Sequence, residues 1–431
     1  MTVSRSHFRD CLRRLQSAHL TAVGCGSTIT EHHFRRQSST YIYNARAMEN
    51  QEQETIQLII DTDVGIDDAT AILVALQHPK AVVKAFTIVD GNVDMRQAVE
   101  NCKTLLSVAH RKDIPIYPGA DGPLVRGIVK KELWPGHGTD GLGGITTHED
   151  LTLPGAHDIK EQKEHAALAL IRMVNENPGV YSIVAIGPLT NIAIAITIDP
   201  TFLTKVKSVY IMGGCLFAKG NANRAAEFNI HCDPEAAHIV FHSSSQLSTP
   251  SNPPKLTLIT WELTVEHGFP WSFFDYLTQT APVNEYGKFL RTVTGCAESL
   301  SRAQHELLAG GPGPTVPTAV LVSKEQLGVS TDAVTGQKTR IRTQHEDYLY
   351  GANSFLMPDL YALVALLDPS SVTSYKDWDV QVELHGHHTR GMTHMDWWGA
   401  SPVPGPNVRV VLAMDREKVK MMLEKSFKTG F

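Results

Sequence analysis

Cysteine is scarce in this sequence of 431 residues, which has six scattered cysteines and no CxxC pair. That density excludes a disulfide-stabilised scaffold and indicates free thiols in a reducing compartment. Long hydrophobic runs are also lacking: no stretch of about 18 apolar residues is present, so we expect no membrane-spanning helix. Neither sign of charge dominates, because the formal net charge is only -6. Nucleic acids and anionic membranes are therefore not expected as partners.

Residues 1–50 lack lysine and the apolar stretch of a secretory signal, although they hold seven arginines. An Arg- and Ser-rich segment with few acidic residues is typical of an organellar transit peptide. A disordered tail, or an upstream extension of a shorter protein that starts at Met48, explains the same composition. We predict a disordered extension at 1–53 and one folded domain at 54–431. The protein is expected in the cytoplasm, or in the mitochondrion if the extension is a transit peptide.

From residue 56 onward, short apolar runs alternate with segments of helical character. The runs, each predicted as a buried strand, lie at 56–60, 82–89, 182–186, 206–212 and 255–259. The segments predicted as helices lie at 67–77, 94–110, 188–197 and 233–241. This alternation predicts an α/β fold: a single domain with a mostly parallel, Rossmann-like central sheet flanked by helices. Two polar stretches, 243–254 and 323–351, are predicted as inserted loops.

Four carboxylates fall within eight residues directly after the first predicted strand, in Asp61-Thr62-Asp63-Val64-Gly65-Ile66-Asp67-Asp68. Open α/β sheets bind ligands at this end of their strands. Carboxylates this close repel one another unless protons or a cation compensate their charge, and oxygen-rich sites suit Ca²⁺ or Mg²⁺. Gly65 is expected to give the backbone the freedom to fold around an ion. A helix cap at Asp67 or Asp68 would account for only one carboxylate.

This segment resembles the N-terminal signature of the inosine-uridine preferring nucleoside hydrolases, a family that cleaves the N-glycosidic bond of ribonucleosides. The resemblance implies that Asp63 is the general base and a ligand of Ca²⁺, and that Asp68 is a bidentate ligand. It also implies that Asp67 binds the ribose 2′-hydroxyl and that Asp61 supports the loop from behind. Val64 departs from the family, which usually has proline at this position.

Further motifs follow in the family's order along nearly the whole chain after residue 54. The segment at 185–191 resembles the one whose backbone carbonyl binds Ca²⁺, here that of Ile186. The segment at 357–362 resembles the one with the last ligand, Asp359, which would also contact the ribose 3′-hydroxyl. The residues implied to surround the sugar are Asn92, Met212, Asn221, Glu227 and Asn229. Of these, Asn221 and Glu227 are implied to hold the 5′-hydroxyl and Asn229 the 3′-hydroxyl; such amide and carboxylate groups suit an uncharged, hydroxyl-rich sugar.

A glycine-rich segment at 137–144, which begins His137-Gly138, resembles the family's flexible active-site loop. There His137 is implied to face the substrate, although a surface loop has the same composition. Purine-active members carry a histidine directly before the last aspartate as the acid for the leaving base, but this chain has Pro358 there. The acid is therefore expected to be His137 or a histidine at 385–394. We expect a preference for pyrimidine nucleosides, or weak selectivity.

The sequence thus predicts hydrolysis of purine or pyrimidine ribonucleosides to base and ribose, by a Ca²⁺-bound water that Asp63 deprotonates. A haloacid-dehalogenase-like phosphatase, which also begins with strand-Asp-x-Asp, is an alternative. It requires threonine or valine where Gly65 stands, and it does not explain Asp67 and Asp68. A non-catalytic calcium- or nucleoside-binding homologue is a third possibility, but it would be expected to lack Asp63 or Asp68. The resemblance also implies a homodimer or homotetramer that acts in nucleoside salvage.

Overall fold

The computed structural model describes residues 55–127, 134–145, 156–247, 253–308, 329–331, 338–340, 354–400 and 405–431. The extension predicted at 1–53 lies outside these residues. Most of the loop predicted at 323–351 lies outside them too, as does part of the loop predicted at 243–254.

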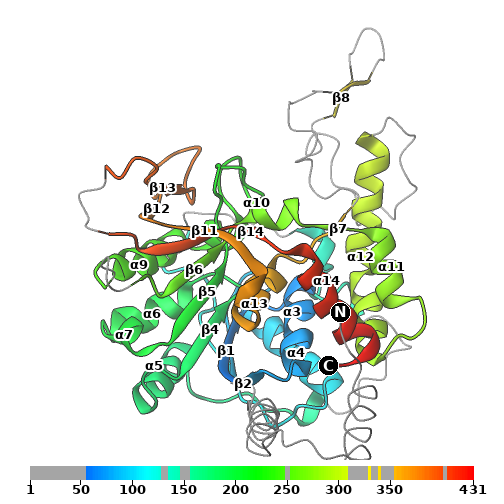
Figure 1. The fold of residues 1–431 in the computed structure, drawn as a ribbon, viewed down its shortest axis with the longest axis horizontal. Coiled ribbons are helices and arrows are strands. Elements are labelled where there is room, and N and C mark those ends of the chain that lie inside the picture. The colour runs from blue at the N-terminus through cyan, green and yellow to red at the C-terminus, as the bar shows by residue number, and fades with distance from the viewer. Residues whose placement is uncertain are drawn as a thin grey trace, which may run out of the picture. The chain divides into compact units, whose positions relative to one another are not determined.

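An eight-stranded sheet forms the centre of the described domain (Figure 1), with strand order β11-β14-β6-β5-β4-β1-β2-β3. Its strands are β1 Ile56–Thr62, β2 Ala81–Ile88, β3 Ile116–Pro118, β4 Tyr181–Ala185, β5 Ser208–Met212, β6 Leu256–Ile259, β11 Val372–Trp378 and β14 Val408–Met414. Only β11 runs antiparallel to its neighbour. The chain builds β1, β2 and β3 in one direction and then returns to place β4 on the other side of β1. The strand order therefore reverses between β1 and β4, and a ligand is expected at their carboxyl ends.

Helices cover both faces of this sheet (Figure 1). Their bounds are α3 Ile66–Gln77, α4 Met95–Val108, α5 Ala166–Glu176, α6 Thr190–Ile198, α7 Phe202–Lys205, α8 Phe228–Cys232, α9 Pro234–Ser245, α10 Trp261–Glu266, α11 Trp271–Thr278, α12 Glu285–Leu308, α13 Pro358–Leu367 and α14 Arg416–Glu424. Three two-stranded pairs complete the fold: β7 Phe269–Pro270 with β10 Ser354–Phe355, β8 Val329–Thr331 with β9 Lys338–Arg340, and β12 Val380–Val382 with β13 Thr393–Met395. Within the described ranges, no helix has both the length and the apolar character needed to cross a membrane.

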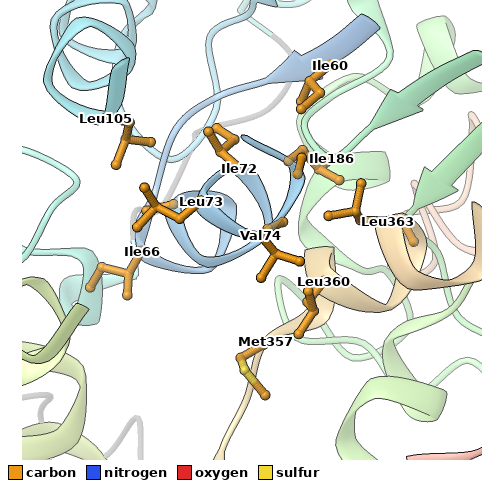
Figure 2. Close-up of a cluster of buried hydrophobic side chains, with 14 of the residues drawn as sticks. Ile60, Ile66, Ile72, Leu73, Val74, Leu105, Ile186, Met357, Leu360 and Leu363 are labelled. Carbon is orange, nitrogen blue, oxygen red and sulfur yellow. The ribbon is translucent and has the colours of Figure 1, made fainter. Parts of the chain in front are cut away.

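The hydrophobic core is divided by the sheet into two clusters. Because side chains alternate along a strand, Leu58 and Ile60 of β1 enter one cluster and Ile59 enters the other. The first cluster joins β1 to α3, α4, α12, α13 and α14, and the second joins it to α5, α6, α7 and α9. Figure 2 shows Val74 of α3 beside Leu360 of α13. The two helices that begin at the carboxylates therefore pack directly against each other.

The predicted α/β fold is confirmed. The apolar runs missed three strands of the central sheet, β3, β11 and β14, and the helical segments missed several helices, among them α5 and α12. Further differences lie at the ends of the predicted elements. Strand β1 extends to Thr62, two residues beyond the predicted run, because its last residues are polar and carry no hydrophobic signal. Asp61 is therefore part of the strand. Helix α9 continues to Ser245, so the loop predicted from 243 begins later than expected.

We predict that Leu73→Ala lowers the free energy of unfolding by about 2–5 kcal/mol, because Leu73 is fully buried on α3 and its loss leaves a cavity. The matched control is Leu168→Ala on α5, where the leucine is 47% exposed and the expected change is within about 0.5 kcal/mol. Urea denaturation followed by circular dichroism measures both. Equal effects of the two substitutions would contradict the packing described for α3.

Candidate active site

The acidic loop, our name for residues 61–68, comprises the end of β1, the turn at 63–65 and the start of α3. It is folded back on its own last carboxylate. Thr62 Oγ1 donates a hydrogen bond to Asp68 Oδ1 (2.5 Å), and the Gly65 amide donates to Asp68 Oδ2 (2.7 Å). Asp68 therefore caps the start of α3, as the simpler interpretation of the sequence proposed. It is also fully buried, which an ordinary cap does not require.

Two residues of this loop are unusual: Val64 in its backbone conformation and Gly65 in how closely other side chains approach it. Val64 has a φ of +32°, a rare and strained value for a β-branched residue. Gly65 has an extended backbone, with φ -95° and ψ -164°, so the freedom expected of glycine is not what this position uses. A Cβ at Gly65 would instead lie 2.6 Å from Asn92 Nδ2 and 2.8 Å from the ring of His137. Glycine is needed here for close approach, which corrects the reason given from the sequence.

Asn92, in the turn after β2, holds two of the carboxylates. Its backbone amide donates to Asp63 Oδ2 (2.7 Å), and its side-chain Nδ2 donates to Asp68 Oδ2 (3.0 Å). The second oxygen of Asp63 is buried and has no hydrogen-bond partner. Asn92 thus lies at the site where the sequence predicted it, but in this structure its amide contacts carboxylates.

Asp61 lies beneath the loop, fully buried. Its Oδ2 accepts hydrogen bonds from Thr87 Oγ1 (2.6 Å) and from Asn191 Nδ2 (3.0 Å). Burial raises the pKa of Asp61 to about 7 despite these bonds. Asn191 also donates to the carbonyl of Ile88 and accepts from the amide of Ala120, so it connects the ends of β1, β2 and β3. Sequence reasoning gave no role to Thr87 or Asn191.

Asp359, at the start of α13, brings a carboxylate from far along the chain. Asp67, Asp68 and Asp359 each offer one oxygen, and these oxygens lie within 4.8 Å of one another. Asp68 and Asp359, both predicted to bind metal, are thus brought together. Asp67, predicted to bind ribose, completes the group of three, whereas Asp63 was the third carboxylate in the prediction. Asp63 lies beside this group and interacts electrostatically with Asp68.

The electrostatics of these carboxylates are those of a cation site. Burial raises the pKa of Asp63 and Asp359 well above the usual range, and the neighbouring negative charges add to the shift. Burial likewise raises the pKa values of Asp67 and Asp68 to about 6. One oxygen each of Asp63, Asp67 and Asp359 is buried without a hydrogen-bond partner. Buried acceptor oxygens that lack a hydrogen-bond partner fit a hard divalent cation.

The predicted sugar-contacting residues after β5 lie at the ends of β4 and β5. Asn229 Nδ2 donates to the carbonyls of Ile186 and Met212, each at 3.2 Å. Glu227 caps α8, and its carboxylate accepts from the amides of Gly214 (2.9 Å) and Asn229 (2.8 Å). Burial raises the pKa of Glu227 to about 7, and the charge of Asp67 adds to the shift. Four of the five predicted residues and Ile186 therefore lie at one edge of the sheet.

Asn221 is the predicted sugar ligand that the structure does not bring into this group. It is exposed, and its Oδ1 accepts a hydrogen bond from the amide of Phe228 (2.8 Å). It therefore contributes to the start of α8. Its contact with a 5′-hydroxyl stays a prediction.

The loop of His137 is not a surface loop. His137 is only 7% exposed, and its Nδ1 accepts a hydrogen bond from the amide of Ile66 (3.2 Å). Burial lowers the pKa of His137 to about 4, so the ring is neutral near pH 7 and carries its proton on Nε2. That atom lies 3.9 Å from Asp67 Oδ1. In contrast, the alternative acids at 385–394 are exposed: His385, His387, His388 and His394.

The fold and the site together define an α/β protein with a carboxylate-rich cation site where the strand order reverses. A model of the family described as inosine-uridine preferring nucleoside hydrolase matches residues 58–421. The chain belongs to this family, as the sequence motifs predicted. The match does not favour the haloacid-dehalogenase-like alternative.

Named relatives agree with this assignment. Uridine nucleosidase 1 of Arabidopsis thaliana is 44% identical over 192 residues, which are 44% of this chain and 55% of that protein. A pyrimidine-specific ribonucleoside hydrolase of Salmonella enteritidis is 29% identical over 84% of this chain and 95% of its own. A solved inosine-guanosine nucleoside hydrolase is similar in structure, with a TM-score of 0.66 and 31% identity over 86% of this chain and 98% of its own. The match to the plant relative spans little more than half of its length.

We predict that a divalent cation stabilises the protein, because it compensates the buried negative charges of the folded state. At a Ca²⁺ concentration 100 times the Kd, the expected gain is about 2.7 kcal/mol. Thermal unfolding with Ca²⁺ or with a chelator measures it. Asp68→Asn and Asp359→Asn should each reduce the gain, whereas Asp113→Asn, at an exposed ion pair with Arg111, should leave it intact. Equal melting temperatures of the native protein in both solutions would contradict the site.

Proposed function

We propose that this protein hydrolyses the N-glycosidic bond of ribonucleosides and releases the free base and ribose. The observation that carries the proposal is the set of carboxylates at the reversal point of the sheet, four of which have a buried oxygen without a hydrogen-bond partner: Asp61, Asp63, Asp67 and Asp359. The family resemblance of the sequence implies metal binding by Asp63 and Asp359 and ribose binding by Asp67 and Asp359. The relatives' names, uridine nucleosidase and ribonucleoside hydrolase, support the same substrate class.

The cation that fits this site best is Ca²⁺. Its ligands would be carboxylate oxygens of Asp63, Asp68 and Asp359 and the backbone carbonyl of Ile186. An all-oxygen ligand set of this kind suits Ca²⁺, which takes six to eight oxygens. The Ile186 carbonyl accepts one hydrogen bond from Asn229 and keeps a second lone pair. When bound, such an ion lowers the pKa of a coordinated water and polarises oxygen ligands.

Asp63 is the residue we propose as general base. Its Oδ2 is fixed by the amide of Asn92, while its Oδ1 is free. Burial makes this carboxylate a stronger base than an aspartate in water. Asp63 would accept a proton from the water that attacks the anomeric carbon, as the bond between that carbon and the base nitrogen breaks. Positive charge then develops on the sugar ring, and the surrounding carboxylates stabilise it.

Asp67 belongs to the carboxylate group of the site, and we propose that it also binds the ribose. Its Oδ1 has no hydrogen-bond partner and lies 3.9 Å from His137 Nε2, and one of its two carboxylate oxygens belongs to the group of three. A free carboxylate oxygen at this position would accept a hydrogen bond from a ribose hydroxyl, as the family resemblance implies. Asp359 would do the same with the 3′-hydroxyl through its free Oδ2. The sugar would thus be held by neutral hydroxyl contacts to anionic acceptors.

We predict that Asp63→Asn lowers kcat for uridine by about 100-fold or more, because asparagine cannot take up the proton. Release of uracil from purified protein with Ca²⁺ measures the rate, and the melting temperature checks that the fold is kept. The matched control is Asp377→Asn, at a partly buried pair with Arg409 that links β11 to β14, which should keep the native rate. Near-native turnover by Asp63→Asn would place the general base elsewhere.

The leaving base is the part of the reaction for which this chain departs from purine-active relatives. Pro358 occupies the first turn of α13 and has no side-chain proton to give. His137 is buried at the site, but it is neutral near pH 7 and offers only its Nε2 hydrogen as a hydrogen-bond donor. Such a donor assists a departing base less than an imidazolium would. We therefore propose that most of the transition-state stabilisation comes from the ribose.

We predict that kcat/KM for uridine equals or exceeds that for inosine, because no strong acid is positioned for a purine ring nitrogen. His137→Ala should lower both values by about 10- to 100-fold if its Nε2 hydrogen assists departure. Steady-state kinetics with both nucleosides measures the ratio. A hundredfold preference for inosine that persists in His137→Ala would contradict both the selectivity and the role of His137.

Assembly and location also stay proposals. We propose a homodimer or homotetramer, on the family resemblance alone, and a role in nucleoside salvage that follows from the released base and ribose. The proposed location is the cytoplasm, or the mitochondrion if residues 1–50 act as a transit peptide.

A further inference from the structure

Asn101, on the second turn of α4, is a buried residue that contacts two loops at once. Its Nδ2 donates hydrogen bonds to the carbonyls of Val64 (3.0 Å) and Asp140 (2.7 Å). Its Oδ1 accepts from Gln97 Nε2 (3.0 Å), one turn earlier on the same helix. Asn101 is only 2% exposed. Both amide hydrogens are therefore used within the protein, one for each loop.

The first of these carbonyls belongs to the strained residue of the acidic loop. A φ of +32° at Val64 persists only if the surrounding structure holds it. The Val64 amide donates to Thr62 Oγ1 (3.2 Å), which in turn donates to Asp68, and the Val64 carbonyl is held by Asn101. The peptide groups on both sides of the strained residue are thus fixed. Val64 and Gly65 connect Asp63 to α3. The conformation of Val64 therefore sets how Asp63 faces the carboxylates of that helix.

The second carbonyl belongs to the loop that carries His137. The Asp140 side chain accepts from the amides of Leu142 (3.0 Å) and Gly144 (2.8 Å), and the Gly143 amide donates to the His137 carbonyl (2.8 Å). The loop is therefore closed on itself. A Cβ at Gly141 would lie 2.8 Å from Asn101 Nδ2, so the loop packs tightly against this side chain.

We propose that Asn101 is a positioning residue that holds the acidic loop and the His137 loop in register. It does so by donating one amide hydrogen to each, and it touches neither substrate nor cation itself. The consequence for the site, which rests on the proposed function, is that Asn101 sets the direction of Asp63 relative to α3. Without it, Val64 relaxes toward a negative φ and the His137 loop loses its contact with α4.

The first test asks whether the hydrogen bond from Asn101 to the Val64 carbonyl acts through the backbone conformation of Val64. Asn101→Ala should lower kcat for uridine by about 10- to 100-fold, as expected for a displaced catalytic group, with a smaller change in KM. Glycine adopts positive φ without strain, so Val64→Gly added to Asn101→Ala should recover part of that loss. Val64→Ala added to Asn101→Ala should not recover it, because alanine has the same preference as valine for negative φ. Equal recovery by both, or none by either, would overturn the proposal.

The second test concerns the hydrogen bond from Asn101 to the Asp140 carbonyl and does not depend on activity. Hydrogen exchange of the amides of Leu142, Gly143 and Gly144 should be at least tenfold faster in Asn101→Ala than in the native chain. Gln97→Ala is the matched control, because it removes the contact to Oδ1 and leaves both donated hydrogen bonds intact. It should leave kcat and exchange unchanged. If Asn101→Ala does not fold, Asn101→Ser keeps one donor, placed one bond closer to the helix, and should show the same changes in smaller size.

These measurements separate the two proposals. If the native chain hydrolyses no ribonucleoside, the proposed function fails, while the exchange experiment still decides whether Asn101 holds the His137 loop. If the native chain is active and Asn101→Ala exchanges and turns over like Gln97→Ala, the positioning role is wrong and the proposed function stands. A fall in melting temperature with unchanged kcat and unchanged exchange would show that Asn101 is only part of the core.

Discussion

Repulsion among buried carboxylates is the constraint around which this fold is arranged. Asp61, Asp63, Asp68 and Asp359 are buried in one region and Asp67 is partly buried beside them, although burial alone disfavours each charge. A hydrophobic core does not bring such groups together. They stay close because extensive apolar packing holds the sheet, α3 and α13 together. This packing offsets the repulsion and the desolvation of the carboxylates. A bound cation would compensate this repulsion, so that the same arrangement of carboxylates becomes favourable.

Three asparagines, in addition to Asn101, fix the backbone around these charges. Asn92 holds Asp63 and Asp68, Asn191 connects three strand ends behind Asp61, and Asn229 joins the ends of β4 and β5. An asparagine amide is suited to this work because it donates two hydrogen bonds and accepts others without adding charge. A lysine or arginine in the same positions would neutralise the carboxylates and compete with a cation. The site is thus held in place by neutral groups, and its negative potential stays available to attract a cation.

The sequence allowed the fold class and the acidic loop to be predicted, because both depend on local patterns. Alternating apolar runs showed the strands, and four aspartates at the end of one run pointed to an ion. Asp359 was found only through resemblance, since one aspartate at a helix start has no distinctive signal. Asn101 and Asn191 had no signal of their own: Asn191 meets Asp61 across 130 positions of the chain. The length of β1 was underestimated for a similar reason: its last two residues, Asp61 and Thr62, are polar and carry no hydrophobic signal.

The strained backbone at Val64 has a consequence for protein engineering. Replacing a residue by the one that relatives prefer at the same position is a common route to higher stability. Here that route would suggest proline, which has a φ near -65° and no amide hydrogen. Position 64 uses φ +32° and donates its amide to Thr62, so neither requirement can be met. A stabilised variant designed by consensus should therefore leave this position as valine.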